Sequence, residues 1–295
     1  MDIIWLGQPE CGDARLVGGK AANLSPLVSR HRVPPGFCLT TEVFPHWMAV
    51  AARYKTELPS GTLPPTLYEA LAMAYQDLAR RCDVADPAVA VRSSAVDEDG
   101  ASVSFAGQYE TFLNVTGAGA VAAAVVRCWQ SLGSQRVLEY RRQHGLPEEG
   151  VGLAVLIQEF IPADVSVIVF SANPVTGGLD EVVINASWGL GESLVGGTVT
   201  PDSYILEKAT LTVVERQIGD KRRMAVPAPQ GTEEVDVPRF LRARPALEDG
   251  QVAELAQLAV ALESTMGWAV DLECAYRAGK LYVLQCRPVT TIGIA

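Results

Sequence analysis

Two spacings of apolar residues alternate along this chain of 295 residues, and together they predict a protein built from helices and strands. Short runs rich in β-branched and other apolar residues favour buried strands, whereas apolar residues that recur every three or four positions favour amphipathic helices. The pattern therefore predicts an α/β (α+β) fold. Strands are expected at residues 3–6, 38–41, 89–91, 153–161, 165–170, 181–185, 270–276 and 281–287, with further strands leading up to residue 218. Helices are expected directly after residue 20 and at residues 67–82, 118–143 and 252–266, and the proline-bearing residues 56–65 and 225–250 are expected to be irregular.

The stretch from residue 89 to residue 115 has the pattern of a buried strand that ends in a charged loop of small residues. Arg92 follows the apolar residues 89–91, and after it come an acidic run with Gly100 and a small-residue turn with Gly107. A guanidinium binds phosphate oxygens through paired hydrogen bonds, and glycine lets the backbone approach an anion closely. The pattern suits a polyphosphate site; an ordinary surface loop with a salt-bridged arginine is the alternative.

Gly18-Gly19-Lys20 is a second candidate for phosphate contact. It does not fit the Walker A pattern, because Ala14 stands where that loop needs glycine and Ala21 stands where it needs a hydroxyl residue. Lys20 can still reach a phosphate as a flexible point charge. A glycine turn beside a solvated lysine is the alternative, and the local sequence alone favours that alternative.

The last two expected strands carry polar residues on one face, because side chains alternate between the faces of a strand. If the strands pair as a hairpin with Glu273 opposite Gln285, then Asp271 lies opposite Arg287. Such a face can hold Mg²⁺ through oxygen ligands while the arginine meets phosphate. A solvent-exposed hairpin face with an ion pair is the alternative. The opposite face is expected to be apolar or nearly so, with Val270, Leu272, Cys274, Tyr276, Tyr282, Leu284 and Cys286.

Two further features bear on nucleotide binding. Gln158 and Glu159 end an apolar strand, where they could present polar groups to an adenine ring. Residues 189–191 (Gly-Leu-Gly) lack the third glycine of a dinucleotide-binding loop, and they follow a hairpin strand instead of opening a βαβ unit. The sequence therefore argues against a dinucleotide site there.

Composition and charge exclude several classes of function. Asp and Glu number 34 against 24 Lys and Arg, and the net charge of −10 argues against nonspecific nucleic-acid binding. No apolar run approaches the length of a membrane span, and the first residues lack the features of a signal peptide. We therefore expect a cytoplasmic protein with no nucleic-acid or membrane partner. The cysteines show no zinc or disulfide spacing and are expected to be thiols in a reducing compartment: Cys11, Cys38, Cys82, Cys128, Cys274 and Cys286.

A series of motifs follows one another along nearly the whole chain: GGKAANL, VPPGF, RSSAVDED, SFAGQYETFLNV, QEFIPADVS, FSANPVTG, NASWGLGESLVGGTVTPD and DLECAY…LYVLQCRPVT. Together they resemble the ATP-binding domain of phosphoenolpyruvate synthase, pyruvate phosphate dikinase and rifampin phosphotransferase. The resemblance implies an ATP-grasp-type fold of two lobes with ATP and Mg²⁺ between them. We accordingly expect one nucleotide-binding module over residues 1–295, with lobes of about 1–185 and 186–295.

The resemblance also implies roles for individual residues in the first part of the chain. Lys20 and Arg92 would bind the ATP phosphates. Gly107 and Thr111 would belong to the loop over the phosphates. Gln158 would lie beside the adenine.

In the C-terminal hairpin, the resemblance implies that Glu273 and Gln285 hold Mg²⁺ and that Arg287 contacts the phosphates near the point of transfer. Together with Lys20 and Arg92, Arg287 would stabilise the charge that develops on the transferring phosphoryl group. The protein would supply positioning and charge, and it would supply no nucleophile of its own.

The chain departs from the family pattern in two places. Val167 follows Ser166 where the family commonly has glycine, and Ala269-Val270 leads into Asp271 where the family commonly has a Pro-Gln pair. Neither departure removes a phosphate or metal ligand, so ATP binding is still expected. Both concern the adenine side or the hinge side of the site.

The full enzymes of this family carry a swivelling domain with a phosphorylated histidine, and we expect no phosphohistidine domain in this chain. None of His31, His46 and His144 has the setting of a carrier, so surface or structural roles are expected for them. The leading hypothesis is a phosphotransferase module of dikinase type. It would transfer phosphate from Mg-ATP to a histidine on a separate carrier, leaving AMP and phosphate. A kinase or ligase that acts directly on a small molecule, and a non-catalytic ATP-binding regulatory or assembly subunit, are the alternatives.

Overall fold

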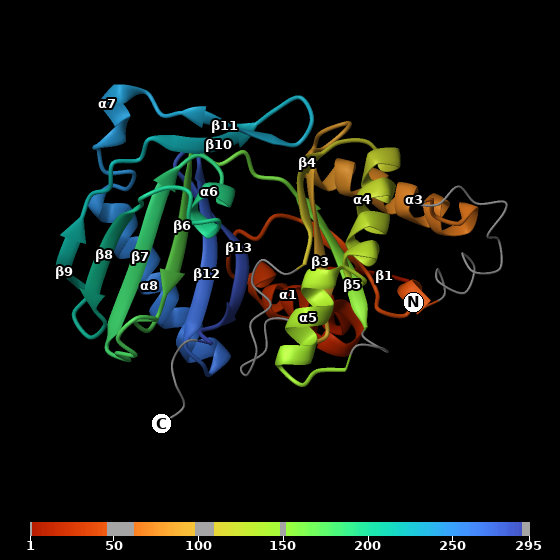
Figure 1. Ribbon diagram of the computed structural model, residues 1–295, viewed down its shortest axis with the longest axis horizontal. Coiled ribbons are helices and arrows are strands. Elements are labelled where there is room, and N and C mark those ends of the chain that lie inside the picture. The colour runs from red at the N-terminus through yellow and green to blue at the C-terminus, as the bar shows by residue number, and fades with distance from the viewer. Residues whose placement is uncertain (1, 46–61, 98–108, 148–151, 291–295) are drawn as a thin grey trace. The chain divides into compact units, whose positions relative to one another are not determined.

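The computed structural model describes residues 2–45, 62–97, 109–147 and 152–290. The chain forms two compact units, Met1–Phe160 and Ile161–Ala295, called unit 1 and unit 2 below. Residues 165–188 form a hairpin that pairs into the sheet of unit 2. Each unit combines helices with a sheet (Figure 1), as the spacing of apolar residues predicts.

Unit 1 is built on a five-stranded sheet with the strand order β1-β2-β5-β3-β4. Neighbouring strands are antiparallel throughout. Strands β3 and β5 lie in the interior of the sheet and are buried along nearly their whole length. The strands are β1 (Ile3–Trp5), β2 (Gly36–Leu39), β3 (Val89–Ala95), β4 (Thr111–Val115) and β5 (Leu153–Glu159).

Helices α3 and α4 bury their apolar stripes in one core with the sheet of unit 1. Leu71 and Leu78 on α3 and Val125 on α4 pack in a cluster that includes Val91 and Ile157 of the sheet. Ser94 alternates with these inward residues, and it contacts α1, so α1 lies on the other face. The helices are α1 (Ala14–Leu24), α3 (Pro65–Cys82), α4 (Ala118–Ser131) and α5 (Gln135–Gln143), and two short 3₁₀ turns are η1 (Pro9–Gly12) and η2 (Ser25–Ser29).

Two helix predictions for unit 1 need correction. The helical region expected over residues 118–143 is two helices, because α4 ends before Gly133 and Ser134 begins α5 by accepting a hydrogen bond from the Val137 N–H. The helix expected after Lys20 already includes the Gly-Gly-Lys segment. That helix, α1, is kinked at Gly18, whose φ of +73° is non-helical.

Unit 2 contains a six-stranded sheet with the order β13-β12-β6-β7-β8-β9, again antiparallel between neighbours. The hairpin expected from residues 165–170 and 181–185 is confirmed, and its second strand runs on to Trp188. The strands are β6 (Val165–Phe170), β7 (Glu181–Trp188), β8 (Asp202–Glu207), β9 (Thr212–Gln217), β12 (Val270–Arg277) and β13 (Lys280–Pro288).

Helix α8 (Asp249–Met266) lies along one face of this sheet (Figure 1). Tyr276 of β12 identifies the covered face, since its hydroxyl donates to the Glu254 carboxylate of α8 over 2.7 Å. Leu272 shares that face by alternation and is fully buried. Glu273 therefore lies on the face that does not meet α8, and so does Asp271.

Residues 225–250, expected to be irregular, are partly regular. They include most of a two-stranded antiparallel hairpin and a short helix, and Gly231, at φ +72°, lies in the turn between the two hairpin strands. These elements are β10 (Arg223–Pro227), β11 (Thr232–Asp236) and α7 (Arg239–Arg242); α6 (Glu192–Val195) lies between β7 and β8 in the sequence. Among the described residues, no helix has both the length and the hydropathy that crossing a membrane requires.

Candidate functional site

The kink of α1 brings Lys20 to the end of β3 in unit 1. At Gly18 a Cβ atom would lie 2.0 Å from the Ser94 carbonyl oxygen, so only glycine permits this approach. The Ser94 hydroxyl accepts from the Ala21 N–H at 3.4 Å. The Lys20 ammonium donates to the Ser93 carbonyl at 3.1 Å. The lysine is thus fixed beside β3, 73 residues away in the sequence, and this differs from the solvated lysine of the alternative interpretation.

Arg92, Thr111 and Gln158 share one face of the unit 1 sheet. Arg92 lies opposite Thr111 on β4, and Gln158 on β5 lies opposite Ala90, two residues before Arg92. Residues directly opposite each other in antiparallel strands point to the same side, and this side is the one that α1 covers. The structure therefore brings together four of the site residues that the resemblance implied for the first part of the chain, Lys20 included.

These side chains differ in exposure. Arg92 and Gln158 are buried, and Thr111 is exposed at the start of β4. The Gln158 amide nitrogen donates to the Pro34 carbonyl at 3.1 Å, so the Pro-Pro-Gly turn before β2 orients it. Gly107 lies outside the described residues, as does Gly100. Sequence reasoning missed that the Ser93 carbonyl accepts from Lys20 and that the Ser94 carbonyl packs against Gly18. The Gly18-Gly19 pair could have indicated this contact, since glycine allows another segment to approach closely.

The C-terminal hairpin of unit 2 has the register on which the sequence argument depended. Glu273 on β12 lies opposite Gln285 on β13, and Asp271 lies opposite Arg287. The same face continues onto β6, where Ile168 lies opposite Glu273. An acid–amide pair and an acid–guanidinium pair therefore stand next to each other on the face that does not meet α8.

A β-bulge in β13 makes the opposite face of the hairpin differ from the one expected from the sequence. Cys274 pairs with Val283, which leaves Leu284 as the extra residue of β13. Beyond the bulge Val283 joins the buried face, at 2% exposure, and Tyr282 lies opposite Ala275 on the polar side. The expectation that Tyr282 and Leu284 share the apolar face with Cys286 was wrong, because a strict alternation cannot pass through a bulge.

Arg287 and Asp271 form an ion pair, with the guanidinium Nε donating to the carboxylate Oδ2 at 2.8 Å. Their side chains are 18% and 8% exposed, so the pair is more enclosed than the solvent-exposed face of the alternative interpretation. Asp271 thereby fixes the orientation of Arg287, while Glu273 is half-buried beside it. Burial raises the pKa of the Cys274 thiol, and nearby carboxylates add to the effect, so this cysteine stays protonated and is unsuited to metal binding.

The hairpin face fits the demands of Mg²⁺ with a nucleotide. Mg²⁺ prefers oxygen ligands and is commonly held by one or two protein groups together with water and substrate phosphates. A Glu273 carboxylate opposite a Gln285 amide supplies two such oxygens on one face. Among the described residues, no group of three or more His, Cys, Asp or Glu side chains is arranged to hold a metal.

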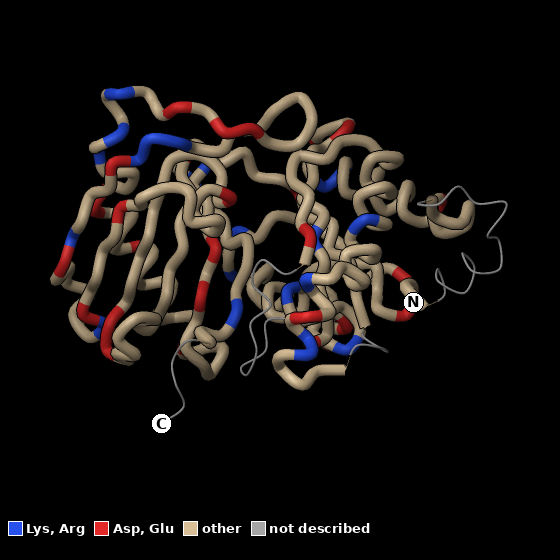
Figure 2. The backbone as a smooth tube through the Cα atoms, in the orientation of Figure 1, with Lys and Arg blue, Asp and Glu red and all other residues tan. Residues whose placement is uncertain are grey.

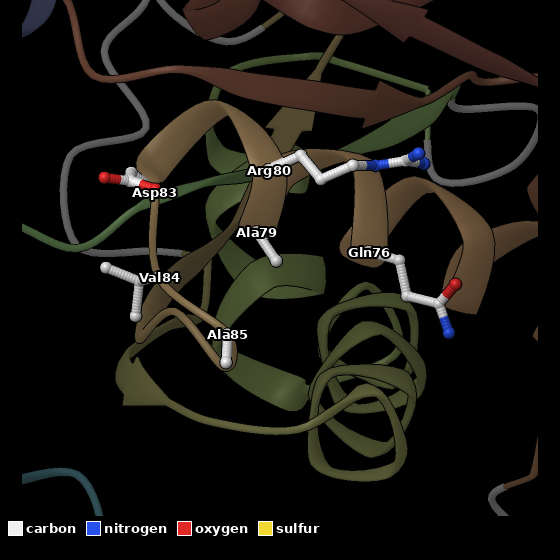
Figure 3. A pocket seen from close by; sticks show the side chains of 6 residues that line it. All are labelled: Gln76, Ala79, Arg80, Asp83, Val84 and Ala85. Carbon is white, nitrogen blue, oxygen red and sulfur yellow. The ribbon is translucent and has the colours of Figure 1, made fainter.

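Two pockets lie away from these residues. One, of about 540 Å³, is lined in unit 1 by the end of α3 and the segment after it (Figure 3): Gln76, Ala79, Arg80, Asp83, Val84 and Ala85. The other, of about 250 Å³, lies in unit 2 beside the β10–β11 hairpin. No residue of the candidate site lines either pocket, so neither adds to the nucleotide argument. Acidic and basic residues are interspersed over the described part of each unit (Figure 2).

The two described histidines have local roles. His144 stacks on Tyr140, and its Nδ1 lies 2.9 Å from the Tyr140 carbonyl. Burial, with a smaller effect of Arg30, lowers the pKa of His31. His46 lies outside the described residues. None of the six cysteines forms a disulfide.

A lysine beside β3 with an arginine of that strand, and an acid, an amide and an arginine on one hairpin face, are groups of the kind that bind a polyphosphate and its cation. Comparison identifies the family. The chain matches the pyruvate phosphate dikinase AMP/ATP-binding domain over residues 14–294, and it belongs to that family.

Relatives of known name support the same assignment. A probable phosphoenolpyruvate synthase of Methanocaldococcus jannaschii is 34% identical over 98% of this chain and 27% of its own length. The phosphoenolpyruvate synthase of Pyrococcus furiosus is 34% identical over 98% of this chain and 44% of its own. The prodigiosin synthesizing transferase PigC of Serratia marcescens is 38% identical over 93% of this chain and 32% of its own. The chain thus spans less than half the length of each of these relatives.

Proposed function

We propose that this chain is the ATP-binding module of a dikinase-type phosphotransferase, active in the cytoplasm. It transfers a phosphoryl group from Mg-ATP to a histidine on a separate carrier protein or domain. In this proposal units 1 and 2 together make one ATP-grasp-type module, and both contribute to the nucleotide site. The observation that carries the proposal is the hairpin face on which Glu273, Gln285 and the oriented Arg287 stand side by side.

Unit 1 supplies the groups for the phosphates and the base. Lys20 and Arg92 bind phosphate oxygens as a point charge and a bidentate donor, respectively. Thr111 offers a hydroxyl and a backbone N–H at the start of β4, and the resemblance adds Gly107 before it. Gln158 lies beside the adenine, with its amide held by Pro34.

Unit 2 supplies the groups at the point of transfer. Glu273 and Gln285 hold Mg²⁺, which neutralises phosphate charge when bound. Arg287, oriented by Asp271, donates to the phosphoryl oxygens on which charge develops. Because these groups are already held in place, their interactions with the phosphoryl oxygens strengthen as negative charge develops there, which stabilises the transition state more than the ground state.

The overall reaction consumes ATP, the carrier histidine and one water, and it yields phosphohistidine, AMP and inorganic phosphate. The nucleophile is the imidazole nitrogen of the carrier, which attacks phosphorus as a P–O bond of the triphosphate breaks. Water takes part in the second P–O cleavage, which accounts for the inorganic phosphate. The chain positions the triphosphate and stabilises its charge throughout.

A second candidate function is ATP-dependent phosphorylation or ligation of a small molecule. The similarity to PigC favours it, since that protein is named as a prodigiosin synthesizing transferase. The two candidates differ in their acceptor and, for a direct kinase, in their nucleotide product. ADP as the product, with no carrier protein required, identifies the direct kinase.

The first experiment is calorimetric titration of a non-hydrolysable ATP analogue with Mg²⁺ into the wild-type chain, Glu273→Ala and the control Glu215→Ala. Glu215 is an exposed acid of β9, in the same unit but outside the candidate site. We expect binding by the wild type and the control and a marked loss in Glu273→Ala. Absence of binding by the wild type would refute the proposal. If the wild type binds, chromatography of the products made from ATP separates AMP, the product of the dikinase reaction, from ADP, the product of a direct kinase.

A further inference from the structure

Arg141 of α5 is buried in unit 1 and bonds to three separate segments of the chain. It is 1% exposed. Its Nε donates to the Pro147 carbonyl at 2.6 Å, Nη1 to the Tyr109 hydroxyl at 2.9 Å and Nη2 to the Asp97 carboxylate at 2.5 Å. A guanidinium is the side chain that can make such a set, because its donors point in fixed directions within one plane.

Two of the three partners flank the connection between β3 and β4. Asp97 lies two residues after the end of β3, and Tyr109 lies two residues before the start of β4. One side chain therefore fixes the distance between the end of β3, the strand that contains Arg92, and the start of β4, where Thr111 lies. The pairing of β3 with β4 extends only to Arg92 and Thr111, so the hydrogen bonds of the sheet do not hold Asp97 and Tyr109 in place.

The bond to Tyr109 reaches the phosphate-binding residues in a few steps. The residue after Tyr109 is Glu110, whose carbonyl accepts from the Ser93 hydroxyl at 2.8 Å and from the Ser93 N–H at 3.3 Å. The Ser93 carbonyl in turn accepts from Lys20. A displacement of Tyr109 therefore shifts Glu110, and with it the segment that places Lys20.

Stability alone is a weak reason for a buried guanidinium at this position. A buried ion pair contributes little net stability relative to apolar side chains of similar volume, and its value more often lies in specifying one geometry. Tyr109 and Val137 near Arg141 are themselves part of an apolar cluster that would accommodate an apolar replacement. The polar set is better explained by the need for a defined position of Asp97 and Tyr109.

We propose that Arg141 is a positioning residue for the phosphate-binding part of the site. It touches no substrate, and it acts by holding Asp97 and Tyr109 so that Arg92, Thr111 and Lys20 are in place for the triphosphate. This inference rests on the proposed function. The same geometry assigns Tyr109 as the link between Arg141 and β4.

The test compares two mild variants with a neighbouring control. Tyr109→Phe removes one hydroxyl and keeps the ring and the Arg141–Asp97 pair, and Arg141→Lys keeps the charge but cannot reach three partners. Arg142→Ala alters the next residue, which is exposed. Each protein is titrated calorimetrically with the non-hydrolysable ATP analogue and Mg²⁺ at a temperature where circular dichroism shows it to be folded.

We expect the Kd of Tyr109→Phe to rise by about fivefold, the typical effect of one hydrogen bond, and that of Arg141→Lys by more. The double variant is expected to bind no more weakly than Arg141→Lys alone, because both changes break one chain of contacts. Nucleotide-induced protection of the Ser93 and Thr111 amides from hydrogen exchange is expected to fall in both variants and to persist in Arg142→Ala.

The outcomes separate the two proposals. If the wild type binds the analogue and the two variants bind as tightly as Arg142→Ala, the positioning role is overturned even if their melting temperatures fall, and the proposed function stands. If the wild type itself does not bind, the proposed function fails, and this inference fails with it.

Discussion

Glu273 on β12 lies directly opposite Gln285 on β13, so that a carboxylate and an amide oxygen share one face of the hairpin. The strand pairing itself places them there, because opposite residues of an antiparallel pair point the same way. Only a slip of the register would separate them. Two residues along, the Asp271–Arg287 ion pair marks the same register with a hydrogen bond between side chains.

The first prediction is that Glu273→Gln raises the Mg²⁺ concentration needed for nucleotide binding by about tenfold or more. The replacement keeps the size and hydrogen-bonding capacity of the side chain but removes the charge that attracts the cation. The measurement is the Kd of the ATP analogue over a series of Mg²⁺ concentrations. Glu215→Gln is the matched control, and equal Mg²⁺ curves for the two variants would remove Glu273 from the metal site.

The second prediction concerns the kink of α1. Gly18→Ala places a Cβ atom 2.0 Å from the Ser94 carbonyl oxygen at a residue with φ +73°, so α1 must move away from β3. The unfolding free energy is expected to fall by about 2–4 kcal/mol, and nucleotide affinity is expected to fall with it, since the shift carries Lys20.

Gly12→Ala is the matched control for this substitution. Gly12 belongs to the turn just before α1, and no atom lies within 4 Å of the position its Cβ would take. Chemical denaturation of both variants gives the comparison. A Gly18→Ala protein as stable as Gly12→Ala would mean that the close approach to Ser94 is not a constraint.

The sequence foretold the hairpin because alternation and a single choice of register determine which residues face each other. It could not foretell the bulge at Leu284, since period-two alternation has no means of showing an extra residue. The Lys20–Ser93 contact was also beyond local reasoning, because its partners are 73 residues apart. Arg141 illustrates the limit best: in the sequence it is one of two adjacent arginines in a polar helix, and only the tertiary fold makes it the buried one.

The third prediction is a pH effect of Glu159, the half-buried acid after Gln158. Burial raises its pKa in the folded chain above the ordinary value of about 4.3. The folded state therefore holds the proton more tightly than the unfolded state does. The stability that comes from this tighter proton binding is fully present below the pKa of Glu159 in the unfolded chain, and it is lost as the pH rises through the pKa of Glu159 in the folded chain.

Glu159→Gln removes this titration, so the variant should gain stability relative to the wild type as the pH rises from 4 to 7. Urea unfolding at a series of pH values measures the difference, and Glu69→Gln, at an exposed position of α3, controls for the loss of one charge. A wild-type minus variant difference that does not change with pH, or that changes in the opposite direction, would contradict the assignment of burial as the cause.

The last prediction concerns the fully buried ion pair of unit 2, in which Lys221 donates to Asp202. The other partners of Asp202 are the Gly219 and Ala246 N–H groups, at 2.9 and 2.7 Å, so the carboxylate ties together segments far apart in the sequence. Lys221→Met leaves this carboxylate buried without its cation, and it should lower the unfolding free energy by about 3–5 kcal/mol.

The adjacent Arg222 provides the matched control, because its ion pair with Asp220 is exposed and such pairs contribute little. Arg222→Met should therefore unfold at nearly the wild-type denaturant concentration. The double variant Lys221→Met with Asp202→Asn should recover part of the loss, since the uncompensated charge is then gone while one amide oxygen still accepts from the backbone. If Lys221→Met were as mild as Arg222→Met, the buried pair would not be what holds residues 219 and 246 to β8.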